Sequence, residues 1–316
     1  MGRYITRRLA LLVPVLIGVS IVTFLLVHLL PGDALELLIG VDQRMTVEQR
    51  AELRHSYGLD APLPVQYLKW ADHVVHGDLG KSLRSGRAIT DELRLRAPVT
   101  FELTLLAAIF GSIPAMLFGI IAAVRRNSWM DYLATLTTLV GVSMPNFWLA
   151  TLLVLIFSLK LHWLPPIQYV PFTEDAGSNL KHMILPAIAL GAPLATVIMR
   201  QTRSAVLEML GQDHVRVARA KGLREAIVLN RHVLRNALIP IITVLGIQIA
   251  RLLGGVFIIE QIFALPGIGR LTLDAIQNRD YAIVQGTVLV IAVISVLISL
   301  TVDILYAIID PRIRVS

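Results

Sequence analysis

Long apolar stretches alternate with short polar segments along this chain, and several reach or exceed about 18 residues with few charges. Because about 20 residues at about 1.5 Å each cross a hydrocarbon core of roughly 30 Å, each stretch has the length of a transmembrane helix. The stretches show no alternation with a period of two, which favours helices over a membrane β-barrel. The pattern predicts six spans, at residues 9–30, 99–124, 133–160, 183–205, 237–260 and 281–309.

The charges between these stretches predict how the chain is oriented. Lys and Arg residues precede the first span, separate the second from the third, crowd between the fourth and fifth, and follow the sixth. Cytoplasmic loops collect positive charge, and six crossings place all four groups on one side. We therefore predict an all-α, polytopic membrane protein with both termini cytoplasmic. A single transmembrane domain would occupy residues 1–316, with a long periplasmic loop at 32–98 and a cytoplasmic loop at 206–236.

The composition fits this class. Hydrophobic residues make up 55% of the chain and the mean hydropathy is +0.70. The net charge of +7 is explained by basic cytoplasmic loops, so we expect no nucleic-acid partner. The chain has no cysteine, which excludes disulfides, thiolate metal sites and a catalytic cysteine. The first apolar run is too long for the core of a secretory signal, so we expect an uncleaved span.

The loops and several spans carry further local signals. In the first outer loop, short helices are predicted from Thr46 to Tyr57 and from about Val65 to His76. Prolines exclude a regular helix from the second outer loop, at about 161–182. Prolines also interrupt spans, and small residues recur every four positions in the second one. These features are packing devices or pivots for moving helices: Pro114, Pro145, Pro186, Pro193, Gly111, Ala115 and Gly119.

The sequence offers little chemistry of its own. The segment Gly77–Ser82 imitates the end of a phosphate-binding loop, but Val75 stands where the pattern needs a glycine. His73 and His76 share a helical spacing without a third metal ligand nearby. No protease or hydrolase motif is present. We therefore predict no catalytic residue, no metal site and no cofactor in this chain, so ATP-driven work would use another polypeptide.

Charged residues inside spans are costly, at about 2.5–3.5 kcal/mol each near a helix centre. Arg251 lies deepest, and Glu260 lies nearer the end of the same span. Both must face protein or water, so they pair within the bundle or line a polar path. The candidates for a translocation path or gate are Pro145, Asn146, Arg251, Glu260 and Phe263.

The segment from Asp213 to Leu223 stands out between two apolar spans. Asp213 is a plausible N-cap, and Arg219 and Lys221 fall in the last turn, where they suit the helix dipole. Gly222 suits a left-handed stop. The pattern predicts a short helix, a sharp break and a second helix that returns to the membrane. A basic loop resting on anionic lipid would explain the charge, but not the alanines or the glycine stop.

These residues resemble a known family, the inner-membrane permease subunits of bacterial binding-protein-dependent ABC importers. That family has a Glu-Ala-Ala signature six residues before a glycine; here Arg216, Val217 and Ala218 stand in its place. The retained alanine and the late Pro240 resemble the dipeptide, oligopeptide and nickel group. Ala282 departs from the proline that the family often has there. Further similar motifs follow in order along the chain: Leu30–Asp33, Tyr57–Asp60, Gly77–Gly80 with Ser82, Pro98–Leu103, Ser143–Trp148, Glu260–Phe263, Pro266–Gly269 and Asp310–Arg312.

The resemblance implies a transport subunit in the bacterial inner membrane. It implies two cytoplasmic ATPase subunits that bind ATP and Mg, a second related permease that forms a heterodimer, and a solute-binding protein. Short peptides are the expected cargo, with glutathione or a nickel or other metal chelate as alternatives. A self-sufficient secondary transporter is a further alternative. The residues implied to contact the ATPase are Asp213, Arg216, Ala218, Arg219, Ala220, Lys221, Gly222 and Leu223.

Overall fold

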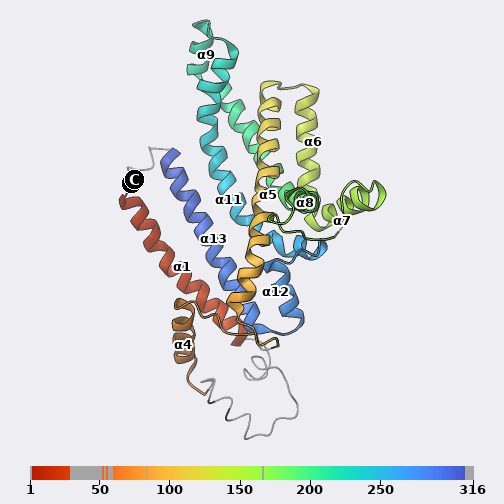
Figure 1. Cartoon of the computed structure of the whole chain (residues 1–316). Helices are drawn as coiled ribbons and strands as arrows, with labels where there is room; N and C mark the ends of the chain where they lie inside the picture. The colour runs from red at the N-terminus through yellow and green to blue at the C-terminus, as the bar shows by residue number, and fades with distance from the viewer. Residues whose placement is uncertain are drawn as a thin grey trace. The chain divides into compact units, whose positions relative to one another are not determined.

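A computed structural model describes residues 2–28, 52, 55, 60–82, 84–165 and 167–309. Within these ranges the chain is helical, and its one β-type contact is an isolated bridge between Lys81 and Ala88. Five of the described helices are long and apolar enough to cross a membrane, or six if one bent pair counts as a single span. The all-α membrane fold predicted from the sequence is confirmed (Figure 1).

The chain divides into two compact units, and some helices run from one into the other. The first unit contains residues 1–5, 101–265 and 297–316. Its helices are the later part of α5 (Ile89–Val124), then α6 (Trp129–Ser143), α7 (Asn146–Leu153), the π-helix η1 (Val154–Lys160), α8 (Ala176–Leu210), α9 (Asp213–Ala220), α10 (Glu225–Ile227), the π-helix η2 (Val228–Leu234), α11 (Arg235–Ile262) and the end of α13 (Tyr281–Ile309).

The second unit contains residues 6–100 and 266–296. It holds most of α1 (Gly2–His28), α4 (Leu63–Val75), the start of α5, α12 (Ile268–Gln277) and most of α13. Aromatic rings of α4 pack on α1, where the Phe24 ring centroid lies 5.6 Å from that of Tyr67. The Ser82 hydroxyl donates to the Asp280 carboxylate at 2.6 Å. The apolar core joins the start of α5 to α12 and α13 through Ile89, Leu93, Ile268, Leu271, Ala275 and Ile283.

Glycines bring α5 and α8 of the first unit into close contact. A Cβ added at Gly111 would lie 2.7 Å from the carbonyl oxygen of Gly191, closer than real Cβ atoms approach. A Cβ at Gly119 would lie 2.8 Å from the Met199 carbonyl oxygen. Membrane helices associate through such small residues because backbones can then approach closely. Packing therefore accounts for the small residues of the second predicted span.

The stretch predicted as one span at 133–160 is broken. The chain bends by 107° between its halves, Trp129–Gly141 and Asn146–Lys160. Pro145 has an extended backbone, with φ −63° and ψ 140°, and its ring nitrogen donates no hydrogen bond. Hydrophobicity continues across this position in the sequence, so composition alone hides the bend.

Two other predicted boundaries move. The loop predicted at about 161–182 ends at Ala176, because the Asp175 carboxylate caps α8 by accepting from the amides of Gly177 at 2.9 Å and Ser178 at 3.0 Å. The predicted loop at 32–98 ends in helix, since α5 begins at Ile89. The helix predicted from about Val65 is α4. The helix predicted from Thr46 to Tyr57 lies almost wholly outside the described residues, as does the end of the first predicted span.

Candidate functional site

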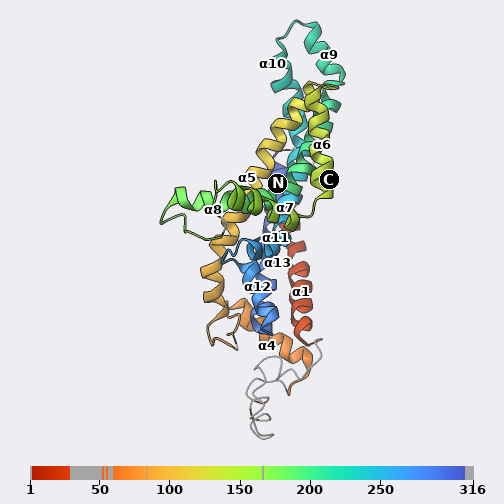
Figure 2. The same ribbon diagram turned by 90° about the vertical axis from the view of Figure 1, so that its right-hand side faces the viewer.

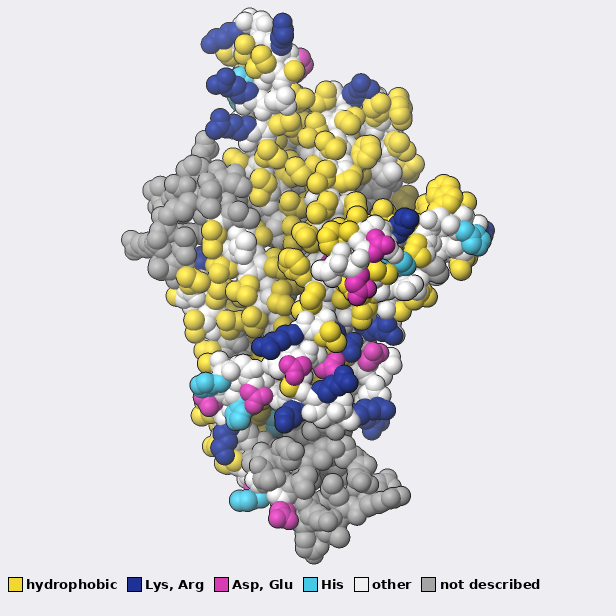
Figure 3. Space-filling model, viewed as in Figure 1, with side chains coloured by type: hydrophobic (Ala, Val, Ile, Leu, Met, Phe, Trp, Pro, Cys, Tyr) yellow, Lys and Arg dark blue, Asp and Glu magenta, His cyan; other side chains and the backbone are white. Residues whose placement is uncertain are grey.

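The basic segment between the fourth and fifth predicted spans folds as a helix, a turn and a second helix. Residue Leu210 ends α8, α9 follows after Gly211 and Gln212, and α10 and η2 lead without a break into α11. Figure 2 shows α9 and α10 together at one end of α11. In Figure 3, Lys and Arg side chains gather over α9.

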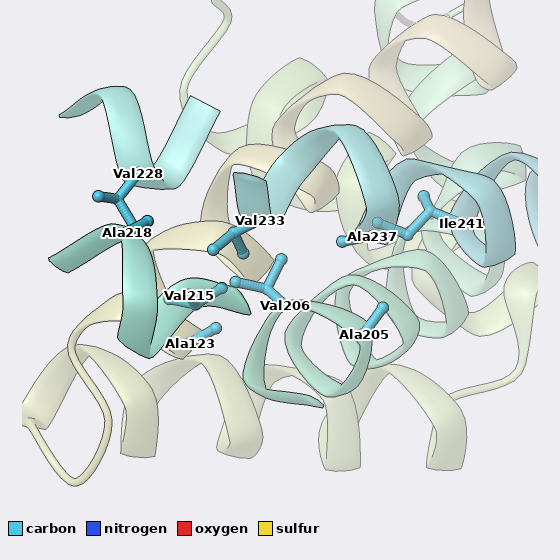
Figure 4. Packing of buried hydrophobic residues seen from close by; sticks show 9 residues of the cluster. All are labelled: Ala123, Ala205, Val206, Val215, Ala218, Val228, Val233, Ala237 and Ile241. Atoms are coloured by element: carbon cyan, nitrogen blue, oxygen red, sulfur yellow. The ribbon is translucent and has the colours of Figure 1, made fainter. Parts of the chain in front are cut away.

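One face of α9 is anchored to the helices beside it. Val215 is fully buried and Ala218 is 4% exposed, and their spacing of three places them on the same face. In Figure 4, Val206, Val215 and Val233 point toward one another from α8, α9 and η2. This cluster fixes α9 to the bundle; its buried members are Ala123, Ala205, Val206, Val215, Ala218, Val228, Val233, Ala237 and Ile241.

A glycine ends α9, as the sequence predicts for this conformation. Gly222 has φ +75°, in the left-handed region. The amide of Leu223 donates to the carbonyl of Ala218 at 3.4 Å, and the amide of Gly222 donates to that of Arg219 at 2.9 Å. This pair of bonds is the Schellman arrangement, which satisfies carbonyls at a helix end. The turn reverses the chain within a few residues.

Asp213 is not the N-cap that the sequence suggests. The cap is Gln212, whose backbone is extended at φ −74° and ψ 148°, so Asp213 is the first residue of the helix. Its carboxylate instead accepts from Arg216 at 3.2 Å, and both side chains are exposed. A carboxylate in the first turn still suits the positive end of the helix dipole.

An ion pair closes the turn on its exposed side. The Arg219 guanidinium donates to the Glu225 carboxylate through Nε at 3.1 Å and Nη2 at 2.5 Å. These hydrogen bonds raise the pKa of Arg219, so the guanidinium stays charged. Sequence reasoning missed Glu225, although an acid six residues beyond Arg219, across a predicted glycine break, was a usable signal.

Apolar side chains stand exposed beside the basic ones. Val217 is 52% exposed and Leu223 is 39% exposed, and Ile227 of α10 is 44% exposed. Ala220 and Lys221 are exposed next to them. We call Val217, Ala220, Lys221, Leu223 and Ile227 the loop face. An anchored helix that presents apolar side chains in a basic surround has the character of a protein-binding surface.

The residues suggested for a path or gate lie at the α6–α7 break and in or just after α11. Pro145 and Asn146 lie at the α6–α7 break, and the Asn146 amide nitrogen lies 3.9 Å from where a Cβ on Gly255 would be. Arg251 is exposed and donates to Gln248 of its own helix at 3.2 Å. Glu260 is fully buried and Phe263 is 2% exposed.

Comparison with known proteins identifies the family. Residues 115–315 match the family described as the binding-protein-dependent transport system inner membrane component. Residues 1–104 match the N-terminal model of the same kind of membrane component. The chain belongs to this family. The resemblance carried by the sequence motifs is thereby confirmed.

Full-length relatives support the same assignment for this permease. It is 44% identical to the dipeptide transport system permease protein DppB of Alkalihalophilus pseudofirmus, with 98% of this chain and 99% of the relative covered. It is 40% identical to the protein of the same name from Escherichia coli strain K12, with 99% of each covered. It is 42% identical to the glutathione transport system permease protein GsiC of Salmonella typhimurium strain LT2, again with 99% of each covered.

A solved structure shows the same fold. The MetNI methionine ABC transporter in an inward-facing conformation matches with a TM-score of 0.56 at 20% identity, covering 69% of this chain and 96% of that one. With the family match and the full-length relatives, the permease is a multi-pass inner-membrane subunit of an ABC importer. Its relatives are transport permeases and not enzymes. Membership in this family implies ATPase and solute-binding-protein partners.

Proposed function

We propose that this permease forms half of the import path for short peptides. ATPase subunits would bind the loop face and couple ATP hydrolysis to the movement of its helices. The observation that carries the proposal is the build of α9. Val215 and Ala218 anchor one face of the helix, while Val217 and Leu223 remain exposed on the loop face. Because α9 packs against α8 and η2, a displacement of the loop face would move these helices with it.

ATP and Mg would bind to two partner ATPases, since this sequence has no phosphate-binding loop. A second, related permease would complete the path as a heterodimer. The energy required is modest, because moving a two-state bundle from 1:99 to 99:1 takes about 5.5 kcal/mol of differential binding. In this arrangement both termini and the loop face are cytoplasmic, and residues 32–98 meet the solute-binding protein on the periplasmic side.

Peptides are supported by the names of the relatives, which are permeases for dipeptides, for di- and tripeptides, and for glutathione. Glutathione is itself a small peptide, so the chemistry of the two cargoes overlaps. A nickel or other metal chelate remains the alternative cargo within the same importer class.

A charge placed on the loop face tests the coupling. Val217→Asp puts a carboxylate on an exposed site, so the chain should still fold and insert. We expect the variant to lose copurification of the ATPase subunits and ATP-dependent peptide uptake in proteoliposomes. The matched control is Val75→Asp, because Val75 of α4 is 83% exposed and far from this loop in the sequence.

Two results would contradict the proposal. One is wild-type uptake by Val217→Asp in the presence of the ATPase subunits. The other is uptake by the chain reconstituted without ATPases and driven by an ion gradient, which would identify a secondary transporter.

A further inference from the structure

An apolar groove runs between α5, α6 and α8 of the first unit. Its volume is about 540 Å³, within the roughly 300–1,000 Å³ typical of ligand sites. Small residues line part of it, among them Gly191, Ala192 and Ala195. Large side chains line the rest, and Phe118 and Trp129 are 59% and 69% exposed. An apolar groove edged by bulky side chains suits a hydrocarbon chain.

The groove offers few polar groups. Its hydroxyl side chains are Thr137 and Thr196, and the indole of Trp129 adds a hydrogen-bonding N–H. The Thr137 hydroxyl donates to the carbonyl of Ala134 at 2.8 Å, and that of Thr196 donates to the carbonyl of Ala192 at 3.1 Å. Both hydroxyls therefore serve their own helices. A peptide or sugar would lose most of its hydrogen bonds to water here, whereas hydrocarbon would lose none.

A pair of arginines stands at one mouth of the groove. Arg125 follows the groove residue Ile121 by one helical turn, and the two are hydrogen-bonded through their backbones at 2.9 Å. Its Nη1 lies 3.3 Å from the sulfur of Met130, which also lines the groove. Arg126 comes next and is exposed. Figure 3 shows Lys and Arg side chains above the hydrophobic surface in this region.

Within the described part of the chain no salt bridge joins Arg125 or Arg126 to a carboxylate, and Asp131 interacts with Arg126 through its charge. The acid nearest in sequence, Asp131, is already occupied by Arg203 and by the amide of Asn127 at 3.0 Å. Trp129 lies beside them, and tryptophan is enriched where a membrane meets water. Arg125, Arg126 and Arg203 thus stand near the single carboxylate of Asp131, and the mouth keeps a net positive charge.

We propose that this groove binds an anionic phospholipid of the cytoplasmic leaflet. Its phosphate contacts Arg125 and Arg126, and one acyl chain lies in the groove between α5 and α8. Basic pockets between transmembrane helices on the cytoplasmic side are suited to acidic headgroups, and arginine can bind phosphate with two parallel hydrogen bonds. The proposal rests on the membrane orientation proposed above and is independent of ATPase coupling.

Lipid titration of the full chain tests both ends of the site. Chain purified in detergent and stripped of lipid is titrated with phosphatidylglycerol, and in parallel with phosphatidylcholine, under native mass spectrometry. We expect tighter binding of phosphatidylglycerol. Arg125→Gln with Arg126→Gln should lose about 25-fold in that affinity, from about fivefold for each charge. Ala195→Phe should weaken binding of both lipids by filling the groove.

The matched control removes two exposed arginines from the same unit, away from the groove, as Arg231→Gln with Arg235→Gln. It should bind phosphatidylglycerol like the wild type. Equal affinity of the Arg125 and Arg126 double variant and the wild type would overturn the proposal.

A second measurement does not depend on removing charge. The chain has no cysteine, so Thr137→Cys creates a single thiol in the groove. We expect phosphatidylglycerol to slow its alkylation by a maleimide. If the thiol reacts freely with lipid present and is protected only by a coexpressed second permease, the groove is a subunit interface and the lipid site is wrong.

Discussion

Arg203 of α8 holds Asp131 of α6 with two parallel hydrogen bonds. Nε lies 2.5 Å from Oδ1 and Nη2 lies 2.9 Å from Oδ2. The Asp131 side chain is 5% exposed and that of Arg203 is 31% exposed, so water screens the pair only in part. The pair ties the turn after α5 to the helix that leads into α9.

Asp131→Asn should therefore destabilise the protein clearly. The change leaves a partly buried guanidinium without its counter-charge, and hydrogen bonds to charged groups contribute about 1.5–3 kcal/mol each. We expect a lower thermal unfolding midpoint in detergent. Asp213→Asn breaks an exposed pair with Arg216 and serves as the control, with a loss below about 1 kcal/mol. Equal midpoints for the two variants would show that the Asp131 pair is not structural.

Gly111→Ala should loosen the α5–α8 contact. The new methyl group would lie 2.7 Å from the Gly191 carbonyl oxygen and 2.8 Å from Leu194 Cδ2. Overpacking of this kind costs about 1–3 kcal/mol. Gly254→Ala gives the opposite expectation, because no atom lies within 4 Å of that Cβ and alanine favours helix by about 0.5–1 kcal/mol. The two unfolding midpoints should move in opposite directions, and a shift of the same sign would refute the close contact.

Substitutions of Gly222 test the effect of backbone strain without a steric clash. No atom lies within 4 Å of its Cβ position, so a substitution there meets space but must adopt φ +75°. A left-handed residue other than glycine costs about 1–2 kcal/mol, and asparagine tolerates the conformation better than others. ATP-dependent uptake should fall in the order Gly, Asn, Val, with membrane insertion unchanged. Uptake by Gly222→Val at the wild-type level would argue against a coupling role for the turn.

Tyr169, in the loop before α8, should show a raised pKa. Its hydroxyl donates to Glu102 Oε2 at 3.1 Å, and burial, followed by that carboxylate, raises the pKa of Tyr169 to about 12. A folded-state pKa above the unfolded value gives stability that is complete below pH about 10 and is lost as the pH rises to about 12. Difference absorbance between the wild type and Tyr169→Phe isolates this titration. A midpoint near 10 would contradict the contact.

Structural features that depend on neighbouring residues could be predicted from the sequence. Hydrophobic length predicted the membrane helices, and the conformational freedom of glycine predicted the stop at Gly222. The predicted N-cap of α9, Asp213, is wrong by one residue. The extended backbone of Gln212 makes Gln212 the cap, and the side-chain type of Gln212 does not predict that conformation.

Contacts between residues far apart in the sequence could not be predicted from it. Asp131 and Arg203 are 72 residues apart, and nothing in either local pattern selects the other as a partner. The buried face of α9 depends in the same way on η2, since Val233 becomes a neighbour only after the chain turns back. The sequence shows a proline at position 145, but it does not predict the size of the bend there. Proline is compatible with a small kink and with a complete break of the helix.

The continuity of α8 has a geometric consequence. The helix runs from the Asp175 cap to Leu210 with Pro186 and Pro193 inside it, and the 17 residues after Pro193 give a segment of roughly 25 Å at about 1.5 Å each. A tilt of about 5° about Pro193 displaces the far end of this segment by about 2 Å. Movements of α9 of this size would therefore reach Pro193, where the missing backbone hydrogen bond lets the helix bend.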